Sequence, residues 1–232
     1  MECIILAGGL GTRLRSAIGE LPKCMAAVNE QPFLYYLLEY LTRQGMKRVI
    51  FSLGYKSEAV LSWLNSNSFP FDIDYVEEKE PLGTGGGIRL ALKKTRNRYT
   101  YVFNGDTLFL ADLKAMQRNF ETLNAEALVA LKQMSCFERY GSVITGPSGI
   151  ILSFEEKAYR DIGDINGGIY LLDRTAFLER DFPDKFSFEK DYLEQYVGEG
   201  RFYGHRFDSY FIDIGVPEDY RKAQSDFKEL FS

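Results

Sequence analysis

A glycine-rich segment with a cation at its end follows the first apolar run of the chain. It reads Ala7-Gly8-Gly9-Leu10-Gly11-Thr12-Arg13-Leu14. Glycines let the backbone approach a phosphate or a flat base closely, and free N–H groups in such a turn form an anion-binding concavity. Arg13 adds a fixed charge whose planar shape suits phosphate oxygens. The segment therefore indicates a phosphate-binding loop, and the alternative is a simple turn between a strand and a helix.

Two common phosphate-binding motifs do not fit this loop. The dinucleotide-binding fingerprint requires a third glycine at position 14, where this chain has Leu14. A P-loop requires Gly-Lys-Ser/Thr, and the sequence contains no Gly-Lys pair. Lys23, which follows Pro22, is a second cation. Alone it is typical of a solvated loop lysine, but together with Arg13 it provides the paired cations that phosphoryl chemistry requires.

A second glycine cluster reads Glu80-Pro81-Leu82-Gly83-Thr84-Gly85-Gly86-Gly87. Consecutive glycines before a helix cost backbone entropy, so they need a structural reason. One interpretation is a helix start that packs tightly on a neighbouring segment. The other is a second wall for a ligand that lies across the ends of parallel strands.

Two aspartates could hold a metal ion. Asp106 follows an apolar strand, and Asp213 lies within Phe211-Ile212-Asp213-Ile214-Gly215, where burial of a lone carboxylate is costly. Each alone is typical of a turn or a helix cap. If both reach the phosphates of a triphosphate, they form a magnesium site, because Mg²⁺ takes one or two carboxylates together with substrate oxygens.

Alternating strand and helix patterns in the first half position these residues. Such alternation predicts βαβ units, right-handed crossovers and a parallel sheet. Asn104-Gly105-Asp106 ends the fourth strand, so Asp106 is expected at the carboxyl edge of the sheet. We expect strands at 3–7, 47–53, 72–76 and 99–103, and helices at 33–41, 59–64 and 87–94.

The second half is richer in strands than in helices. A turn at 146–149 separates two of the strands, and Pro217 stands at a position permitted in the first turn of a helix. The pattern predicts a more antiparallel lobe fused to the parallel sheet. The expected strands are 127–132, 141–145, 150–157 and 168–172, and the expected helix is 217–230.

The composition excludes several functional classes. With 28 Lys+Arg against 33 Asp+Glu, the net charge of −5 argues against sequence-independent nucleic-acid binding. The single histidine, His205, excludes a His₂ or His₃ metal site. Cys3, Cys24 and Cys136 form no C-x-x-C pair, which indicates a reducing compartment. Glu2 does not fit a signal peptide and no apolar stretch approaches the ~20 residues of a membrane span, so we expect a soluble, cytoplasmic protein without a membrane partner.

Taken in order, these motifs resemble those of the sugar-phosphate nucleotidyltransferases, and the likeness covers essentially the whole chain. It departs at Ala158, where many members have proline, which bears on the placement of Lys157. The resemblance implies an α/β fold, a Rossmann-like three-layer αβα sandwich with a mostly parallel mixed sheet and a smaller sugar-binding lobe. It implies one domain over 1–232, with a nucleotide-binding half at about 1–110 and a sugar-phosphate-binding half at about 111–232. The motifs are 8–14 with Pro22-Lys23, 104–106, 139–141, 154–157, 166–170, 186–191 and 213–215.

The resemblance also implies a reaction. An oxygen of a sugar 1-phosphate attacks the α-phosphorus of a nucleoside triphosphate, and pyrophosphate leaves. The nucleophile arrives ionised and needs no general base, so the barrier is mainly electrostatic repulsion and alignment. The implied catalytic residues are Arg13 on the triphosphate, Lys23 between the two reacting phosphates, and Asp106. Asp106 and Asp213 are the implied ligands of the cofactor Mg²⁺.

The remaining site residues are implied in two groups. Lys157, together with Arg13 or Lys23, would offset the incoming phosphate. Glu156, Asn166 and the Gly141 backbone would hold sugar hydroxyls. The nucleotide group is Leu6, Ala7, Gly8, Gly9, Gly11, Thr12, Arg13, Glu80, Pro81, Gly83, Thr84, Asn104 and Gly105. The sugar-phosphate group is Lys23, Tyr140, Gly141, Glu156, Lys157, Asn166 and Gly167.

Within the family, the sequence is most similar to guanylyltransferases that act on D-glycero-α-D-manno-heptose 1-phosphate, through 78–86, 131–134, 153–157 and 210–220. Mannose 1-phosphate guanylyltransferases and N-acetylmuramate 1-phosphate uridylyltransferases share parts of the pattern and remain alternatives. The expected substrates are GTP and a sugar 1-phosphate, and the product would be a GDP-heptose for a capsule or other surface polysaccharide. A carboxylate accepts both donors of guanine N1–H and N2–H₂. Glu80 is our candidate for this role, and the alternative is a surface glutamate before a proline.

Two functions of other classes are weighed against this one. A non-catalytic sugar-nucleotide sensor would not need to keep Arg13, Lys23 and both aspartates. An NAD-linked sugar dehydrogenase is disfavoured by Leu14. The 18 Phe and 15 Tyr residues leave room for a homo-oligomer interface, but aromatic rings also fill cores, so the oligomeric state stays open.

Overall fold

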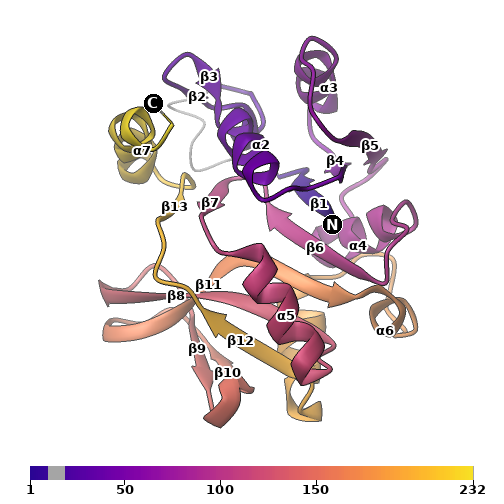
Figure 1. Cartoon of the computed structure of the whole chain (residues 1–232), viewed down its shortest axis with the longest axis vertical. Helices are drawn as coiled ribbons and strands as arrows, with labels where there is room; N and C mark the ends of the chain where they lie inside the picture. Colours follow the sequence, from indigo (N-terminus) through magenta and orange to yellow (C-terminus); the bar gives the residue numbers. More distant parts are fainter. Residues whose placement is uncertain (10–18, 232) are drawn as a thin grey trace.

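The computed structural model describes residues 1–9 and 19–231. In this part of the chain one mixed sheet takes strands from both halves, in the order β10-β9-β11-β6-β1-β4-β5, while β8 pairs with β11 and β12 pairs with β8 (Figure 1). The join between the halves is the antiparallel pairing of β6 with β11. The Rossmann-like α/β fold with a mixed sheet is confirmed.

The first half holds the parallel strands, as predicted. β1 pairs in parallel with both β4 and β6, and β4 pairs in parallel with β5. The strands are β1 (Glu2–Ala7), the short β2 (Ala27–Val28) and β3 (Gln31–Pro32), β4 (Arg48–Leu53), β5 (Asp72–Glu77) and β6 (Tyr99–Asn104). The helices are η2 (Lys23–Met25), α2 (Phe33–Arg43), α3 (Ser57–Asn65) and α4 (Gly83–Leu92).

The second half is largely antiparallel. Its strands are β7 (Thr107–Phe109), β8 (Ala127–Phe137), β9 (Ser142–Thr145), β10 (Ile151–Glu155), β11 (Arg160–Asp173), β12 (Phe202–Arg206) and β13 (Phe211–Asp213). Its helices are α5 (Leu113–Leu123), η3 (Pro147–Gly149), α6 (Arg174–Leu178), the π-helix η4 (Phe188–Glu194), η5 (Val197–Glu199) and α7 (Pro217–Leu230). β12 is an exception because it runs parallel to β8.

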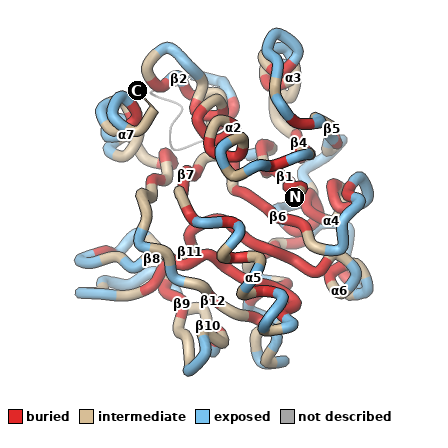
Figure 2. The backbone as a smooth tube through the Cα atoms, viewed as in Figure 1, coloured by how far each residue is buried: buried red, intermediate tan, exposed pale blue. Residues whose placement is uncertain are grey.

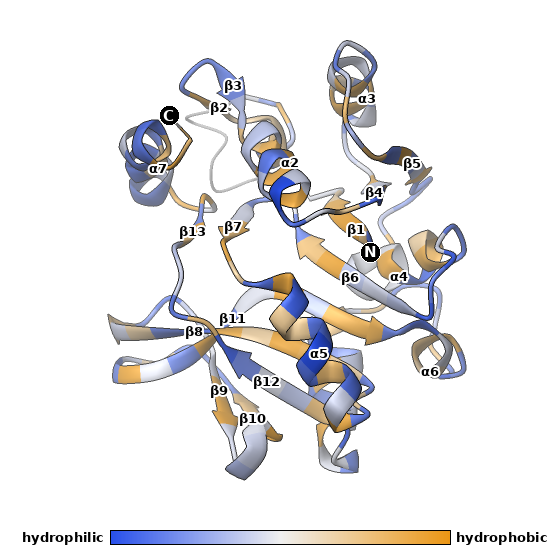
Figure 3. Cartoon of the chain, in the orientation of Figure 1, coloured by the Kyte–Doolittle hydropathy of each residue, from blue (hydrophilic) through white to orange (hydrophobic). Residues whose placement is uncertain are grey.

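Alternate residues of β1 face two different hydrophobic clusters, which defines three layers. Cys3 and Ile5 pack in the cluster that contains buried residues of α2, α3, α5 and α7. Ile4 packs in the other cluster, with buried residues of α4, α6 and η4. Figure 2 shows the buried strands between the helices, and Figure 3 shows the hydrophobic colour concentrated on β1 and β6. No helix within residues 1–9 and 19–231 is long and apolar enough to cross a membrane.

Several elements differ from those that the sequence pattern predicts. α4 begins at Gly83 rather than at residue 87. β11 begins eight residues before the predicted 168, because its polar first part is held by pairing with β8 rather than by an apolar pattern of its own. α5 was not expected, although Asp112 caps its first turn by accepting a hydrogen bond from Ala115 N and Leu113, Met116 and Phe120 form its buried face. His205 lies in β12, where its ring forms a hydrogen bond with Asn119 and stacks on Phe207. These contacts give the single histidine a packing role.

Candidate active site

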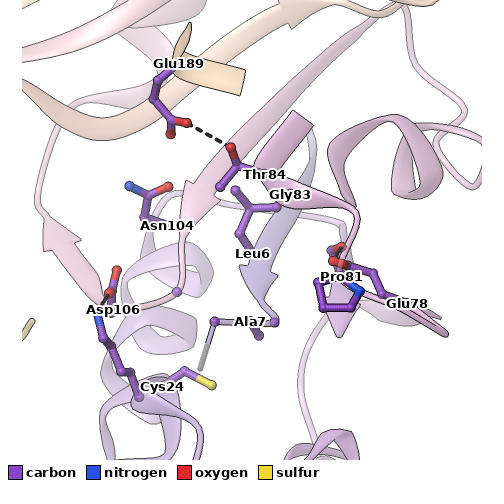
Figure 4. Close-up of a pocket in the computed structure, with 15 residues that line it drawn as sticks. Leu6, Ala7, Cys24, Glu78, Pro81, Gly83, Thr84, Asn104, Asp106 and Glu189 are labelled. Atoms are coloured by element: carbon purple, nitrogen blue, oxygen red, sulfur yellow. Dashed lines mark hydrogen bonds and ion pairs between the residues drawn. The ribbon is translucent and has the colours of Figure 1, made fainter. Parts of the chain in front are cut away.

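A cavity of about 590 Å³ opens at the carboxyl edge of the parallel strands (Figure 4). The volume is typical of a site for a small molecule. Eleven residues of the predicted site line it: Leu6, Ala7, Gly8, Gly9, Lys23, Pro81, Gly83, Thr84, Asn104, Gly105 and Asp106. Gly11, Thr12 and Arg13 lie outside the described residues.

Lys23 and Asp106 meet at one end of this cavity, and Asp213, which does not line it, lies next to Asp106. Lys23 Nζ donates to Asp106 Oδ2 at 2.7 Å. β13 pairs with β7 so that Asp213 is opposite Thr107, the neighbour of Asp106, and Ile214 N donates to Asp106 O at 3.0 Å. This short ribbon brings together two carboxylates that are far apart in the sequence.

The electrostatics of this pair suit a divalent cation. Burial and then the charge of Asp106 raise the pKa of Asp213 to about 6, although Gly215 N donates to Asp213 Oδ1 at 2.7 Å. A bound cation relieves this repulsion, and carboxylate oxygens are the ligands that Mg²⁺ prefers. The described residues contain no group of three or more His, Cys, Asp or Glu that could hold a metal. The two aspartates would therefore leave the other coordination positions to phosphate oxygens and water.

At the other end of the cavity, the structure places Glu78 rather than Glu80. Glu78 lines the cavity, accepts a hydrogen bond from Leu82 N at 2.9 Å and lies beside Ser52. A Cβ at Gly87 would lie 2.8 Å from Glu78 Oε1, so the third glycine of the run makes room for this carboxylate. Glu80 is exposed and lines a separate cavity with Arg89 and Lys93.

The predicted sugar residues Asn166 and Gly167 lie next to the cavity wall formed by Asn104. Asn166 Nδ2 donates to the Tyr170 hydroxyl at 2.8 Å, and Asn166 Oδ1 accepts from Gly168 N at 3.0 Å. A Cβ at Gly168 would lie 3.0 Å from Asn104 Nδ2, which puts this loop in contact with Asn104. Burial, then the charge of Glu189, raises the pKa of the Tyr170 hydroxyl.

The other predicted sugar residues do not line the cavity. Tyr140 packs edge-on against Phe211, and burial and the charge of Asp213 raise its pKa to about 12. Gly141 packs on the Glu155 backbone, where a Cβ would lie 2.6 Å from the carbonyl oxygen. Glu156 and Lys157 are exposed after β10. Tyr140 therefore lies on the Asp213 side of the site, and the structure does not bring Glu156 and Lys157 into it.

Four residues that line the cavity were not predicted: Cys24, Ser52, Glu78 and Glu189. Glu78 could have been found, because it stands two residues past the strand predicted at 72–76, and directly after β5, at the carboxyl edge of the sheet. Ser52 lies inside a strand, and Cys24 follows Lys23, so neither is distinguished by its sequence surroundings. Burial and the charge of Asp106 raise the pKa of the Cys24 thiol to about 12, which makes this thiol a poor nucleophile. Glu189 belongs to the segment 186–191, to which the motif gave no role.

Comparison with known proteins agrees with this geometry. The family model "Nucleotidyl transferase" matches residues 2–229. The chain is 48% identical over 226 residues to the D-glycero-alpha-D-manno-heptose 1-phosphate guanylyltransferase of Aneurinibacillus thermoaerophilus, covering 97% of this chain and 98% of the relative. It is 46% identical over 220 residues to the protein of the same name from Campylobacter jejuni, covering 95% and 97%.

A solved structure shows the same similarity. The crystal structure of HddC from Yersinia pseudotuberculosis complexed with GMP-PN superposes with a TM-score of 0.88 at 39% identity, covering 97% of this chain and 99% of that one. Mannose-1-phosphate guanylyltransferase of Mycobacterium tuberculosis is less similar, at 32% identity over 97% of this chain and 64% of the relative. The sequence, the fold and the cavity all indicate one enzyme class.

Proposed function

Because the chain belongs to the nucleotidyl transferase family, we propose that it joins GTP to D-glycero-α-D-manno-heptose 1-phosphate, giving GDP-heptose and pyrophosphate. The observation that carries the choice of substrates is the 48% and 46% identity, over nearly the full length, to two enzymes named for this heptose phosphate. The reaction class is supported by the cavity, which has Lys23, Asp106 and the adjacent Asp213 at one end and Glu78 at the other.

The chemistry follows from the charges in the cavity. A phosphate oxygen of the sugar substrate attacks the α-phosphorus of GTP, a P–O bond forms, and the bond to the departing pyrophosphate breaks. The nucleophile is already an anion, so the site must offset repulsion between two polyanions rather than remove a proton. Lys23 would exchange its contact with Asp106 for phosphate oxygens on both substrates. Arg13, which lies outside the described residues, is proposed to act on the triphosphate.

Asp106 and Asp213 are proposed to hold Mg²⁺, as their proximity and oxygen chemistry favour. The ion would supply positive charge that offsets the negative charge of the phosphates. Asp106 would fix the position of the phosphates relative to Lys23, and the Gly215 N–H would fix the carboxylate of Asp213.

The base is proposed to lie at the Glu78 end. A glutamate carboxylate accepts the paired N1–H and N2–H₂ donors of guanine, which adenine lacks. Glu78 takes precedence over Glu80 because Glu78 lines the main cavity. The sugar phosphate is proposed to lie toward Asn166, Gly167, Tyr140 and Gly141, and Glu156 and Lys157 would reach it only if the loop after β10 moves inward.

We also propose a cytoplasmic location and a product used for surface polysaccharide assembly. Three cysteines are free in the structure, with Cys3 and Cys24 buried and Cys136 exposed, which is typical of a reducing compartment. GTP is a cytoplasmic metabolite, so the substrate would be available there.

A substrate matrix tests the proposal. Four nucleoside triphosphates are each mixed with heptose, mannose or N-acetylmuramate 1-phosphate and Mg²⁺, and pyrophosphate release is measured. The pair GTP and heptose 1-phosphate should give the highest kcat/KM. A preference for mannose 1-phosphate would replace the sugar assignment, and absence of release with every pair would overturn the enzymatic function. Omission of the divalent cation should abolish release.

A further inference from the structure

Glu189 reaches the cavity from η4, an element of the second half that sequence motifs left without a role. We propose that Glu189 is a specificity-determining residue that accepts hydrogen bonds from hydroxyl groups of the sugar 1-phosphate. This inference rests on the proposed function, since it assigns a residue to recognition of that second substrate.

Two hydroxyl side chains hold the Glu189 carboxylate in place. Thr84 Oγ1 donates to Glu189 Oε2 at 2.8 Å (Figure 4), and Ser187 Oγ donates to the same oxygen at 3.2 Å. Thr84 Oγ1 in turn accepts from Phe188 N at 2.9 Å. The described residues provide these donors to Oε2, and none is found for Oε1, which leaves that oxygen for a ligand.

The backbone that carries Glu189 is also fixed to the first half. Gly85 N donates to Phe186 O, and Phe186 N donates to Leu82 O, both at 3.0 Å. This approach requires glycine, because a Cβ at Gly85 would lie 2.2 Å from the Phe186 ring. The carboxylate is therefore presented by a docked segment rather than by a free loop, which is the preorganisation that selective hydrogen bonding requires.

The charge distribution decides what Glu189 can bind. Phosphates belong at the opposite end of this wall, near Lys23 and Asp106, since a second carboxylate would repel them. Figure 4 shows Asn104 between Glu189 and Asp106, and Glu78 with Pro81 on the other side of the cavity. A carboxylate beside an amide, away from the base and phosphate positions, matches the vicinal hydroxyls of a sugar, where the carboxylate accepts and the amide both donates and accepts.

The sugar of the sugar 1-phosphate and the ribose of GTP both offer such hydroxyls. We assign Glu189 to the former because it lies beyond Asn104 on the side of Tyr170, which is hydrogen-bonded to Asn166 in the sugar-binding half. The two sources predict different kinetic results, so one set of variants separates them.

The test compares Glu189→Gln and Glu189→Ala with the unaltered chain. We expect kcat/KM for heptose 1-phosphate to fall roughly 10- to 100-fold, as for loss of hydrogen bonds to a charged group, while KM for GTP stays unchanged. The variants should also discriminate less between heptose 1-phosphate and deoxy analogues of it. Thr84→Val should give a smaller loss of the same kind, and Thr84→Ser, which keeps the hydroxyl that donates to Glu189, should lose less than Thr84→Val.

Glu194→Gln is the matched control, because Glu194 is an exposed glutamate on the same helix. It should leave both kinetic constants unchanged, and thermal unfolding should show that each variant is folded. The inference is overturned if Glu189→Gln changes neither constant. It is also overturned if the change appears in KM for GTP, or in the ratio of GTP to 2′-deoxy-GTP, which would place the ribose there.

A binding measurement separates this inference from the proposed function. Calorimetric titration of heptose 1-phosphate, in the presence of a non-hydrolysable GTP analogue, should show weaker binding to Glu189→Gln than to the unaltered chain. Equal affinity would overturn the inference even if the unaltered chain is an active enzyme. Absence of pyrophosphate release from every substrate pair, with this affinity difference intact, would overturn the catalytic function alone.

Discussion

Lys23 is the one cationic side chain among the described residues that line the cavity. Its ammonium group donates a hydrogen bond to Asp106. In the proposed reaction Lys23 would exchange this contact for the incoming phosphates, which offer stronger and more numerous acceptors. Asp106 would then keep the amine in place until the substrates bind. Both residues were predicted from the sequence as part of the site, and both line the cavity.

The first prediction concerns this charge. Lys23→Met should lower kcat about 10²-fold or more, because a fixed cation contributes most in the transition state, where charge on the phosphates increases. Pyrophosphate release with saturating GTP and heptose 1-phosphate measures it. Lys114→Met, which alters an exposed lysine of α5, should leave the rate unchanged. An active Lys23→Met variant would remove Lys23 from the catalytic assignment.

The second prediction concerns the reading of the base. Glu78→Gln should lower kcat/KM for GTP roughly 10- to 100-fold, because an amide cannot accept both guanine donors. It should also narrow the preference for GTP over ITP, which lacks the exocyclic amine. Glu80→Gln is the comparison variant and should behave as the unaltered chain. If Glu80→Gln shows the loss instead, the base assignment belongs to Glu80, as the sequence suggested.

At the scale of elements, the second glycine cluster combines the two interpretations that its sequence allowed. Gly85 packs on Phe186, and Gly83 with Thr84 lines the cavity. The start of α4 is thus both a close-packed helix end and a wall of the site. Both roles follow from one requirement, which is that the segment 184–189 must lie against this helix.

A cluster around Glu126 holds η4, the helix that carries Glu189. Glu126 is buried at 1% exposure before β8, and it accepts hydrogen bonds from Arg180 Nε at 2.7 Å and from the Tyr192 hydroxyl at 3.0 Å. Arg201 also pairs with it, at 2.5 Å. Glu126 therefore links β8, the region after α6, η4 and the start of β12.

The third prediction tests this link. Glu126→Ala should lower the free energy of unfolding by about 3 kcal/mol, because it removes the buried partner of Arg180 and of the Tyr192 hydroxyl and leaves Arg180 only the partly exposed Glu199. Urea unfolding measures it. Arg201→Ala should cost about 1 kcal/mol or less, since the Arg201 side chain is half exposed. Equal losses of unfolding free energy in the two variants would show that burial does not determine how much each ion pair of Glu126 stabilises the fold.

At the scale of the whole molecule, the two halves share one sheet. β6 from the first half pairs with β11, which pairs with β8, and the cluster that contains Ile4 also contains Tyr170 and Phe188. Neither half can separate without exposing apolar surface and breaking strand pairs. The cavity takes lining residues from both halves, so both must be folded for it to exist.

The fourth prediction follows from the shared sheet. The chain should unfold in a single cooperative transition, as expected for one domain. Fluorescence of Trp63, in α3 of the first half, and far-ultraviolet circular dichroism should give the same midpoint in urea. Two separated midpoints would show that the halves are independent domains.

The sequence by itself determined the class of fold and many of the residues that line the cavity, Lys23 and Asp106 among them. Apolar runs that end in glycine or in Asn104-Gly105-Asp106 predict parallel strands and mark their carboxyl edge, because strand period and turn chemistry are local properties. Lys23, Asp106 and the lining glycines were found in this way. The unexpected α5 also had local signals, in its Asp112 cap and in the spacing of Leu113, Met116 and Phe120.

Only the tertiary structure decided the rest, because the remaining contacts are made across the chain. The pairing of β13 with β7 brings Asp213 beside Asp106, and no spacing in the sequence encodes that pairing. The residue at which β5 ends decides that Glu78 lines the main cavity. Glu80, two residues later, lines a separate cavity. Glu189 enters the site because glycines on α4 admit the segment that carries it, which is a property of close packing rather than of local pattern.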